Sequence, residues 1–318
     1  MSLPTDLAPE MRALAERVAL EDGPQPDTTT LQPAEGRALA ARLAERWNRN
    51  LPPMAEARWA TVAADPALGA AEQELLVLRP EGARPGAILF VHGGGFASCD
   101  ARTHERCARA LALASGLPVV LPNYRLAPED PFPAGLMDVV AARRQAFTAS
   151  GLPEGPLLLA GDSAGANLAL AAQLHEQQHA GRPAAAALML FYGVFDADFG
   201  TESYGVFAEG PGLTRPKMQR YWDFYLADRD GRRDPLAAPL HAPEAALRAL
   251  PPLHLVAAGI DPLLGDTLNF AARLRALGRP QAVTVVPGVV HGFLQMSEHL
   301  PQAREAIAAA GGFARRFG

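Results

Sequence analysis

The sequence predicts an α/β fold: an eight-stranded, mostly parallel sheet with helices on both faces. From about residue 56, short aliphatic runs alternate with stretches whose apolar residues recur at helical spacing. Such alternation is typical of a parallel sheet with crossover helices. An apolar content of 49% with only 20% charged residues also indicates a sizeable buried core.

Each expected strand is a short apolar run bounded by turn residues or by a helical stretch. The eight runs lie at residues 58–63, 74–78, 87–91, 118–121, 157–160, 187–192, 253–257 and 282–286. Helical spacing is clear after the seventh strand, where Phe270, Leu274 and Leu277 share one helix face. We therefore expect each crossover helix to pack back on the sheet.

Two regions do not fit this alternation. Residues 1–50 contain two amphipathic helical pieces, and residues 195–250 form a long insertion rich in aromatic residues, Gly and Pro. An insertion of that length without strand character is more often a lid than a plain loop. We expect both regions to pack together as a cap over the carboxyl edge of the sheet. The α/β core would then consist of residues 51–194 and 251–318.

Charge and hydropathy exclude several classes of partner. With 29 Lys+Arg against 34 Asp+Glu the net charge is −5, and no basic run could follow a phosphate backbone, so we do not expect nucleic acid. The longest apolar stretch, 184–195, is shorter than the roughly 18 residues of a membrane span. Charges within the first twenty residues leave no apolar signal-peptide core. These features predict a cytoplasmic protein.

The sequence does not indicate cysteine or metal chemistry. Cys99 and Cys107 are too few for a disulfide framework, and we interpret both as free thiols. Neither lies in a motif that would activate it as a nucleophile. There is no H-E-x-x-H, no paired Cys-x-x-Cys and no dense His/Asp cluster. We therefore expect no metal and no cofactor.

The pentapeptide GDSAG at residues 161–165 is the most informative segment. It follows the apolar run 157–160 and precedes a helical stretch, which is the context that G-x-S-x-G requires. A serine on such a sharp turn has strained backbone angles that expose its hydroxyl, so its neighbours must be small. The following helix directs free N–H groups and its positive end toward a developing oxyanion. Ser163 is therefore the candidate nucleophile.

A second glycine-rich segment, HGGGF at residues 92–96, follows the strand 87–91. Consecutive glycines at a strand end let the backbone approach a ligand and present its N–H groups without obstruction. No phosphate-binding or dinucleotide-binding glycine pattern continues from this segment. We interpret it as a source of oxyanion donors.

The acid and base should follow the serine in the order serine, acid, histidine. Asp261 comes soon after the strand 253–257, and His291 comes soon after the strand 282–286. Both would reach the same carboxyl edge as Ser163, where open α/β sheets bind their ligands. Asp196, after the sixth strand, is the alternative acid, although we favour Asp261. We interpret Asp162 as structural, because its side chain should diverge from that of Ser163.

The other seven histidines suit catalysis less well. Two flank the glycine segment and are expected to orient its backbone, namely His92 and His104. Two fall on the helix after the serine, namely His175 and His179. Three have no strand-end placement, namely His241, His254 and His299.

These motifs together resemble the hormone-sensitive lipase family of α/β-hydrolases, bacterial carboxylesterases marked by HGGG and GDSAG. The YRLAPE segment at 124–129 and the DPL segment at 261–263 are similar to further motifs of that family. The resemblance covers the chain from about residue 40 to its end. It implies an α/β-hydrolase fold with a helical cap. It also implies an oxyanion hole made of the backbone N–H groups of Gly94, Gly95 and Ala164.

The expected function is that of a serine carboxylesterase, in which Ser163 attacks, His291 accepts the proton and Asp261 orients the imidazole. The resemblance implies a small-molecule ester with a short-to-medium acyl chain, and a homodimer formed through the edge strand 282–286. Amidase, lactonase or acyltransferase activity stays open, because an acyl-enzyme can form from, or pass to, other groups. The other alternative is a receptor-like ligand binder. Such non-catalytic relatives lack the catalytic histidine, whereas this chain has His291.

Overall fold

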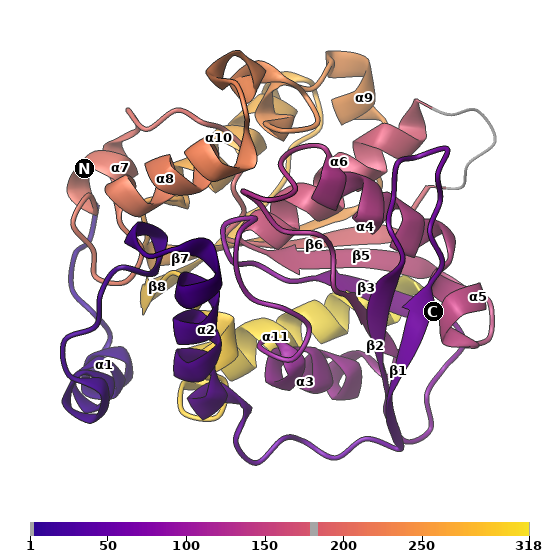
Figure 1. Ribbon diagram of the computed structural model, residues 1–318, viewed down its shortest axis with the longest axis horizontal. Helices are drawn as coiled ribbons and strands as arrows, with labels where there is room; N and C mark the ends of the chain where they lie inside the picture. Colours follow the sequence, from indigo (N-terminus) through magenta and orange to yellow (C-terminus); the bar gives the residue numbers. More distant parts are fainter. Residues whose placement is uncertain (1–2, 179–183, 318) are drawn as a thin grey trace.

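The computed structural model describes residues 3–178 and 184–317. Its centre is a sheet with the strand order β1-β2-β4-β3-β5-β6-β7-β8 (Figure 1). The strands are β1 (Glu56–Val62), β2 (Gln73–Arg79), β3 (Ala87–Val91), β4 (Val119–Pro122), β5 (Leu157–Asp162), β6 (Ala187–Phe191), β7 (Leu253–Ile260) and β8 (Val283–Val290). The predicted α/β class and all eight predicted strands are confirmed, and only the strand ends differ.

The sheet is parallel except at one end, where β2 pairs antiparallel with both β1 and β4. Alternate residues of a strand point to opposite faces, and β2 shows this clearly. Leu75 and Val77 belong to the hydrophobic cluster on one face, whereas Leu76 and Leu78 belong to the cluster on the other. Because both faces are covered there, the inner strands β3, β4 and β6 are buried apolar runs rather than alternating ones.

Helices cover both faces of the sheet (Figure 1). Below it in that view lie α3 (Glu105–Ser115) and α11 (Pro301–Ala314), and above it lie α4 (Ala134–Arg144), α6 (Ala164–Gln177) and α10 (Leu264–Ala276). The short α5 (Ala146–Ser150) packs beside β1. Phe270 and Leu274 of α10, and Leu277 directly after it, are all buried in the cluster on the α4/α6 face, which confirms the predicted apolar face.

The insertion at 195–250 forms short helices, all within the described part of the chain. They are α7 (Glu202–Val206), α8 (Arg215–Tyr225) and α9 (Glu244–Arg248), with 3₁₀ turns at Arg229–Arg233 and Pro239–His241. In Figure 1 these orange segments lie along the top of the molecule, above β6 and β7. Leu213 and Met218 of this insertion line the same pocket as Ser163. The insertion therefore lies over the carboxyl edge of the sheet.

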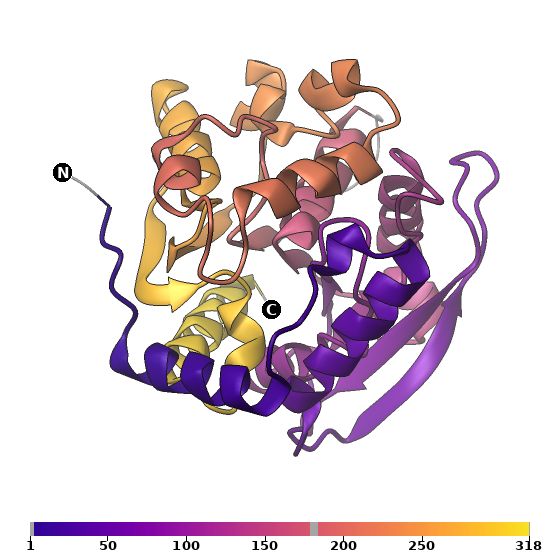
Figure 2. The ribbon, with the colours of Figure 1, turned by 60° about the vertical axis from the view of Figure 1, so that its left-hand side comes forward.

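The N-terminal region divides between two places. α1 (Pro9–Asp22) lies low in the molecule, where Met11 and Leu14 are buried in the α3/α11 cluster (Figures 1 and 2). The 3₁₀ turn Thr28–Thr30, which comes before α2 (Pro33–Ala44), contacts α8 instead. Arg220 of α8 donates to the Thr29 hydroxyl at 2.6 Å and forms an ion pair with Asp27. This link joins the N-terminal region to the insertion.

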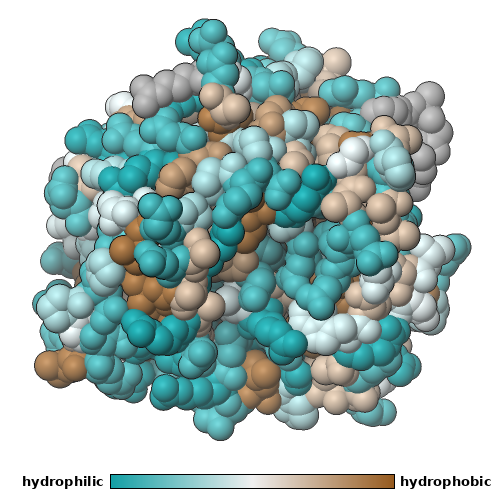
Figure 3. Space-filling model, in the orientation of Figure 1, coloured by the Kyte–Doolittle hydropathy of each residue, from teal (hydrophilic) through white to brown (hydrophobic). Residues whose placement is uncertain are grey.

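Polar side chains cover most of the face seen in Figure 3, with small apolar patches between them. Within residues 3–178 and 184–317, no helix has the length and apolar character needed to cross a membrane.

Candidate active site

Ser163 occupies the sharp turn between β5 and α6. Its backbone angles are φ 54° and ψ −124°, a strained combination for a residue with a side chain. Gly165 lets this turn form, because a Cβ there would lie 2.0 Å from the Val91 carbonyl oxygen. The Ser163 N–H donates to the Phe191 carbonyl of β6 at 2.9 Å, which ties the turn to the sheet. The serine hydroxyl therefore projects beyond the strand ends.

Three side chains from different strand ends meet in a row. The Ser163 Oγ lies 2.8 Å from His291 Nε2, and His291 Nδ1 lies 2.7 Å from Asp261 Oδ2. Asp261 is fully buried, and its Oδ1 also accepts the Leu263 N–H at 2.9 Å. That second bond fixes the carboxylate, so its free lone pairs face the imidazole. The arrangement has the geometry of a nucleophile, a base and an orienting acid.

Asp196, the alternative acid, lies in a different hydrogen-bond network. Its Oδ1 is 2.9 Å from His241 Nε2, and its backbone N–H donates to Asp266 at 3.1 Å. Asp266 is itself buried, and burial raises the pKa of its carboxyl well above the ordinary value. Within the described residues, Asp261 is the carboxylate that hydrogen-bonds to His291.

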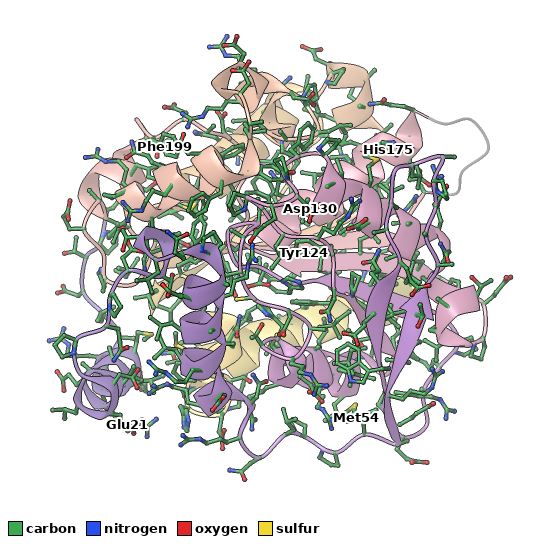
Figure 4. All side chains as sticks on the ribbon, in the orientation of Figure 1. Glu21, Met54, Tyr124, Asp130, His175 and Phe199 are labelled. Atoms are coloured by element: carbon green, nitrogen blue, oxygen red, sulfur yellow. The ribbon has the colours of Figure 1, made fainter. Side chains whose placement is uncertain are left out.

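The remaining histidines lie in structural settings. His254 stacks on Phe313 with 5.3 Å between ring centroids, and His299 packs edge-on against Trp47. Figure 4 shows His175 on α6, well away from Tyr124 at the centre of the view. His179 falls outside the described residues.

The glycine segment forms a loop beside Ser163. Gly94 and Gly95 have φ values of 113° and 60°, a region that side chains disfavour. The loop is held by the Ser98 N–H, which donates to the Gly94 carbonyl at 3.0 Å. In the parts of the chain that the structure covers, no protein acceptor is found for the N–H groups of Gly94, Gly95 and Ala164. The loop and the start of α6 thus leave three donors for a ligand.

Asp162, the residue before Ser163, joins this loop to the serine turn. Its Oδ1 accepts the Gly93 N–H at 2.9 Å and lies 3.2 Å from His104 Nε2, while its Oδ2 accepts the Tyr192 hydroxyl at 3.3 Å. Burial opposes its charge, but the interactions with His104 and His291 and the hydrogen bond from the Gly93 N–H outweigh burial, so the pKa of Asp162 is lowered. The carboxylate therefore stays ionised in the interior. The structural interpretation of Asp162 agrees with these contacts.

His92 and His104 hold the loop from its other side. His92 stacks on Tyr124 with 4.2 Å between ring centroids, and the Tyr124 hydroxyl donates to the His92 carbonyl at 2.8 Å. Tyr124 follows β4 in the chain and lies near the centre of Figure 4. His104 Nε2 lies 2.6 Å from Gln295 Nε2, at the edge of the pocket. Both histidines contact the loop backbone, as we expected.

A pocket of about 130 Å³ opens above the serine. Besides the serine, the histidine and the loop glycines, its lining includes four residues that no sequence motif identified: Leu213, Met218, Tyr221 and Gln295. The first three come from the insertion, and their only signal in the sequence was its aromatic and apolar character. Gln295 lies four residues after His291, in the 3₁₀ turn Phe293–Met296, and nothing in the sequence marked it.

The two cysteines are free thiols. Burial raises the pKa of Cys99 to about 11 and that of Cys107 well above its ordinary value. Among the residues that the structure describes, no group of three or more His, Cys, Asp or Glu side chains could hold a metal ion.

Known proteins share this fold. A family model for the α/β-hydrolase fold matches residues 88–295. An acetyl-hydrolase from Streptomyces hygroscopicus is 37% identical over 231 residues, which is 72% of this chain and 75% of that protein. A solved ester-hydrolase from the metagenome of Lake Arreo, complexed with a bipyridine phosphonate derivative, is similar with a TM-score of 0.88 and 31% identity over 98% of both chains.

A thermostable esterase from Pseudomonas putida is also similar, with a TM-score of 0.85 and 29% identity over 99% of both chains. The chain therefore belongs to the α/β-hydrolase fold family, which confirms the resemblance that its motifs indicated. Within that family it is an ester hydrolase.

Proposed function

We propose that the protein is a serine carboxylesterase that cleaves short-to-medium-chain acyl esters through an acyl-enzyme on Ser163. The observation that carries this proposal is the unbroken row from Ser163 Oγ to His291 at 2.8 Å and from His291 to Asp261 at 2.7 Å. The strained serine and the three free N–H groups beside it support the same chemistry.

In the first half-reaction, Ser163 Oγ attacks the carbonyl carbon and its proton moves to His291 Nε2. The carbonyl π bond opens, and the resulting oxyanion accepts hydrogen bonds from the N–H groups of Gly94, Gly95 and Ala164. Asp261 holds the imidazole with its other proton on Nδ1 and stabilises the imidazolium. When the intermediate collapses, the bond to the alcohol oxygen breaks and His291 returns the proton to that oxygen.

In the second half-reaction, water attacks the acyl-enzyme. His291 removes the water proton, and the same three N–H groups stabilise the second oxyanion. The bond from the carbonyl carbon to Ser163 Oγ then breaks and the serine recovers a proton from His291. Ester and water are thereby converted to carboxylic acid and alcohol, and the enzyme returns to its starting state.

The insertion at 195–250 and the segment around Thr28–Thr30 would act together as a cap over this site. Their ion pair between Arg220 and Asp27, and the pocket residues Met218 and Tyr221, support that role. A small pocket with an apolar wall suits an ester with short chains better than a triglyceride. The curated acetyl-hydrolase relative is consistent with short acyl groups.

The test is hydrolysis of a p-nitrophenyl ester series, from acetate to dodecanoate, by the wild type and by Ser163→Ala. We expect turnover, with a burst of one nitrophenol per active site for esters whose acyl-enzyme is hydrolysed more slowly than it forms. Ser163→Ala should lose the burst and most of the turnover. Turnover that persists in Ser163→Ala, or a folded wild type without turnover, would reject the serine mechanism.

A further inference from the structure

The pocket above Ser163 is small in comparison with an ester substrate. Its volume is about 130 Å³, whereas an apolar cavity of roughly 150 Å³ holds one benzene molecule, which has only six carbon atoms. The reacting ester group itself fills much of that space. There is consequently little room beside the scissile carbonyl for more than a short chain.

The aromatic ring of Tyr221 closes this pocket against the glycine loop. A Cβ added to Gly95 would lie 2.3 to 2.5 Å from Cγ, Cδ1 and Cδ2 of the Tyr221 ring. The ring thus lies directly against the Gly95 backbone. Gly95 is one of the residues whose N–H we assign to the oxyanion hole, so Tyr221 stands immediately beside the position of the substrate carbonyl.

Contacts on both sides of Tyr221 hold it in place. Trp222 and Tyr225 of α8 are buried against Phe96 of the loop, and the Phe96 and Tyr225 rings stack with 3.8 Å between centroids. On the other side, Arg220 of α8 pairs with Asp27. Burial raises the pKa of Tyr221 to about 12, although hydrogen bonding with Ser98 and Thr28 opposes that shift. The ring is therefore a fixed wall.

A second, smaller space lies behind this wall. It has a volume of about 20 Å³, and its lining includes the apolar side chains of Leu31, Pro33 and Phe224. Tyr221 lines both spaces, and of the described residues around them it is the one they share. Removing the ring would join the two spaces and add the volume that the ring occupies.

The chemistry decides which part of the substrate faces Tyr221. The leaving alcohol oxygen must lie near His291 Nε2, because the imidazolium returns its proton there. The acyl chain leaves the carbonyl carbon in a different direction. Since the Tyr221 ring lies against Gly95, on the side of the oxyanion donors, we infer that the acyl chain runs toward Tyr221.

We propose that Tyr221 sets the upper limit of acyl-chain length, and that the enzyme consequently prefers acetyl and propionyl esters. This inference rests on the proposed esterase function. Tyr221 acts through its ring, as a barrier between the pocket at Ser163 and the space lined by Leu31, Pro33 and Phe224. It is a specificity-determining residue and takes no part in proton transfer.

The experiment measures kcat/KM for p-nitrophenyl acetate, butyrate, hexanoate and octanoate. For the wild type we expect kcat/KM to be highest for acetate and to fall steeply from butyrate onward. For Tyr221→Ala we expect the ratio of octanoate to acetate to rise by about tenfold or more, since one methylene accommodated in an apolar pocket changes kcat/KM by about tenfold or more. Tyr221→Leu is a milder change and should raise the octanoate-to-acetate ratio as well. If the alanine variant does not fold, Tyr221→Leu tests the proposal in its place.

Two variants serve as matched controls. Tyr221→Phe keeps the ring and removes only the hydroxyl, so its chain-length profile should match the wild type. Phe224→Ala lies one helical turn further along α8 and enlarges only the space behind the wall. Its profile should also match the wild type, because the wall is intact.

A parallel series of acetate esters with longer alcohols tests the direction of the acyl chain. If the Tyr221 variants change the chain-length profile of the alcohol series but not that of the acyl series, the assignment is overturned. It is also overturned if folded, active Tyr221→Leu has the same acyl profile as the wild type. If Ser163→Ala is inactive and the Tyr221 variants keep the acyl profile of the wild type, only this inference is rejected. Persistent activity in Ser163→Ala would reject the serine mechanism itself.

Discussion

The carboxylate of Asp162 accepts the backbone N–H of Gly93 at 2.9 Å, which couples the residue before the nucleophile to the first glycine of the oxyanion loop. The two residues belong to different strand ends and are 69 positions apart in the chain. Through this bond the position of the oxyanion donors depends on the serine turn. The contact is part of the interior, since the Asp162 side chain is only 4% exposed.

Asp162→Asn should therefore lower kcat with little change in KM. The amide keeps the shape of the side chain but removes the charge, and a hydrogen bond to a charged group contributes about 1.5–3 kcal/mol. That range corresponds to a fall of roughly 10-fold to 100-fold if the loss is felt in the transition state. Steady-state kinetics on p-nitrophenyl acetate would measure it. Tyr192→Phe removes the longer hydrogen bond to the same carboxylate and should lower kcat less. An equal kcat for Asp162→Asn and the wild type would disprove the coupling.

The two candidate acids predict different outcomes on substitution. Asp261→Asn should reduce kcat by about 10⁴, because an amide favours the wrong imidazole tautomer and does not stabilise the imidazolium. Asp196→Asn should leave kcat close to that of the wild type, because Asp196 pairs with His241. Single-turnover kinetics on both variants, with circular dichroism to check folding, would measure the difference. A large loss in Asp196→Asn with a small loss in Asp261→Asn would reverse the assignment.

The buried imidazole of His92 predicts a loss of stability in acid. Burial, helped by the neighbouring His104, lowers the pKa of His92 to about 4, against the hydrogen bond to the Gly93 carbonyl. Between pH 6.5 and pH 4 the unfolded chain binds a proton at this position and the folded chain does not. Stability therefore falls as the pH falls through that window, by roughly 3 kcal/mol in total.

Urea unfolding at several pH values would measure this slope, with His92→Gln as the comparison. The variant should be less stable at neutral pH, because it loses the ring that stacks on Tyr124, but its stability should depend less steeply on pH. His254 and His299 also have lowered pKa values and contribute equally to both proteins. Identical slopes for the two proteins would show that His92 does not titrate abnormally.

Much of the fold could be predicted because its signals are local. The runs that became β3 and β5 are apolar on both faces, as strands buried between two helix layers must be. The GDSAG turn was recognisable for a similar reason, because a strained serine before a helix needs small neighbours, and Gly165 has no space for a Cβ. These requirements act over a few residues.

The distances within the site could not be predicted in the same way. The sequence left Asp196 and Asp261 both available as the acid, since each follows a strand that ends at the same edge. The choice depends on how β6, β7 and β8 lie side by side and on where the loop after β8 carries His291. The 2.7 Å contact between His291 and Asp261 is a property of that assembly.

The sequence by itself determined the strands, the helices that cover them and the nucleophilic turn, because backbone sterics and hydrophobic periodicity act between near neighbours. Only the tertiary structure decided that Tyr221 lies against Gly95 and that the Asp162 carboxylate accepts the Gly93 N–H. These contacts join segments that are far apart in the chain, and their geometry follows from the packing of whole elements. Pocket size depends on such contacts, because each wall of the pocket is supplied by a different part of the fold.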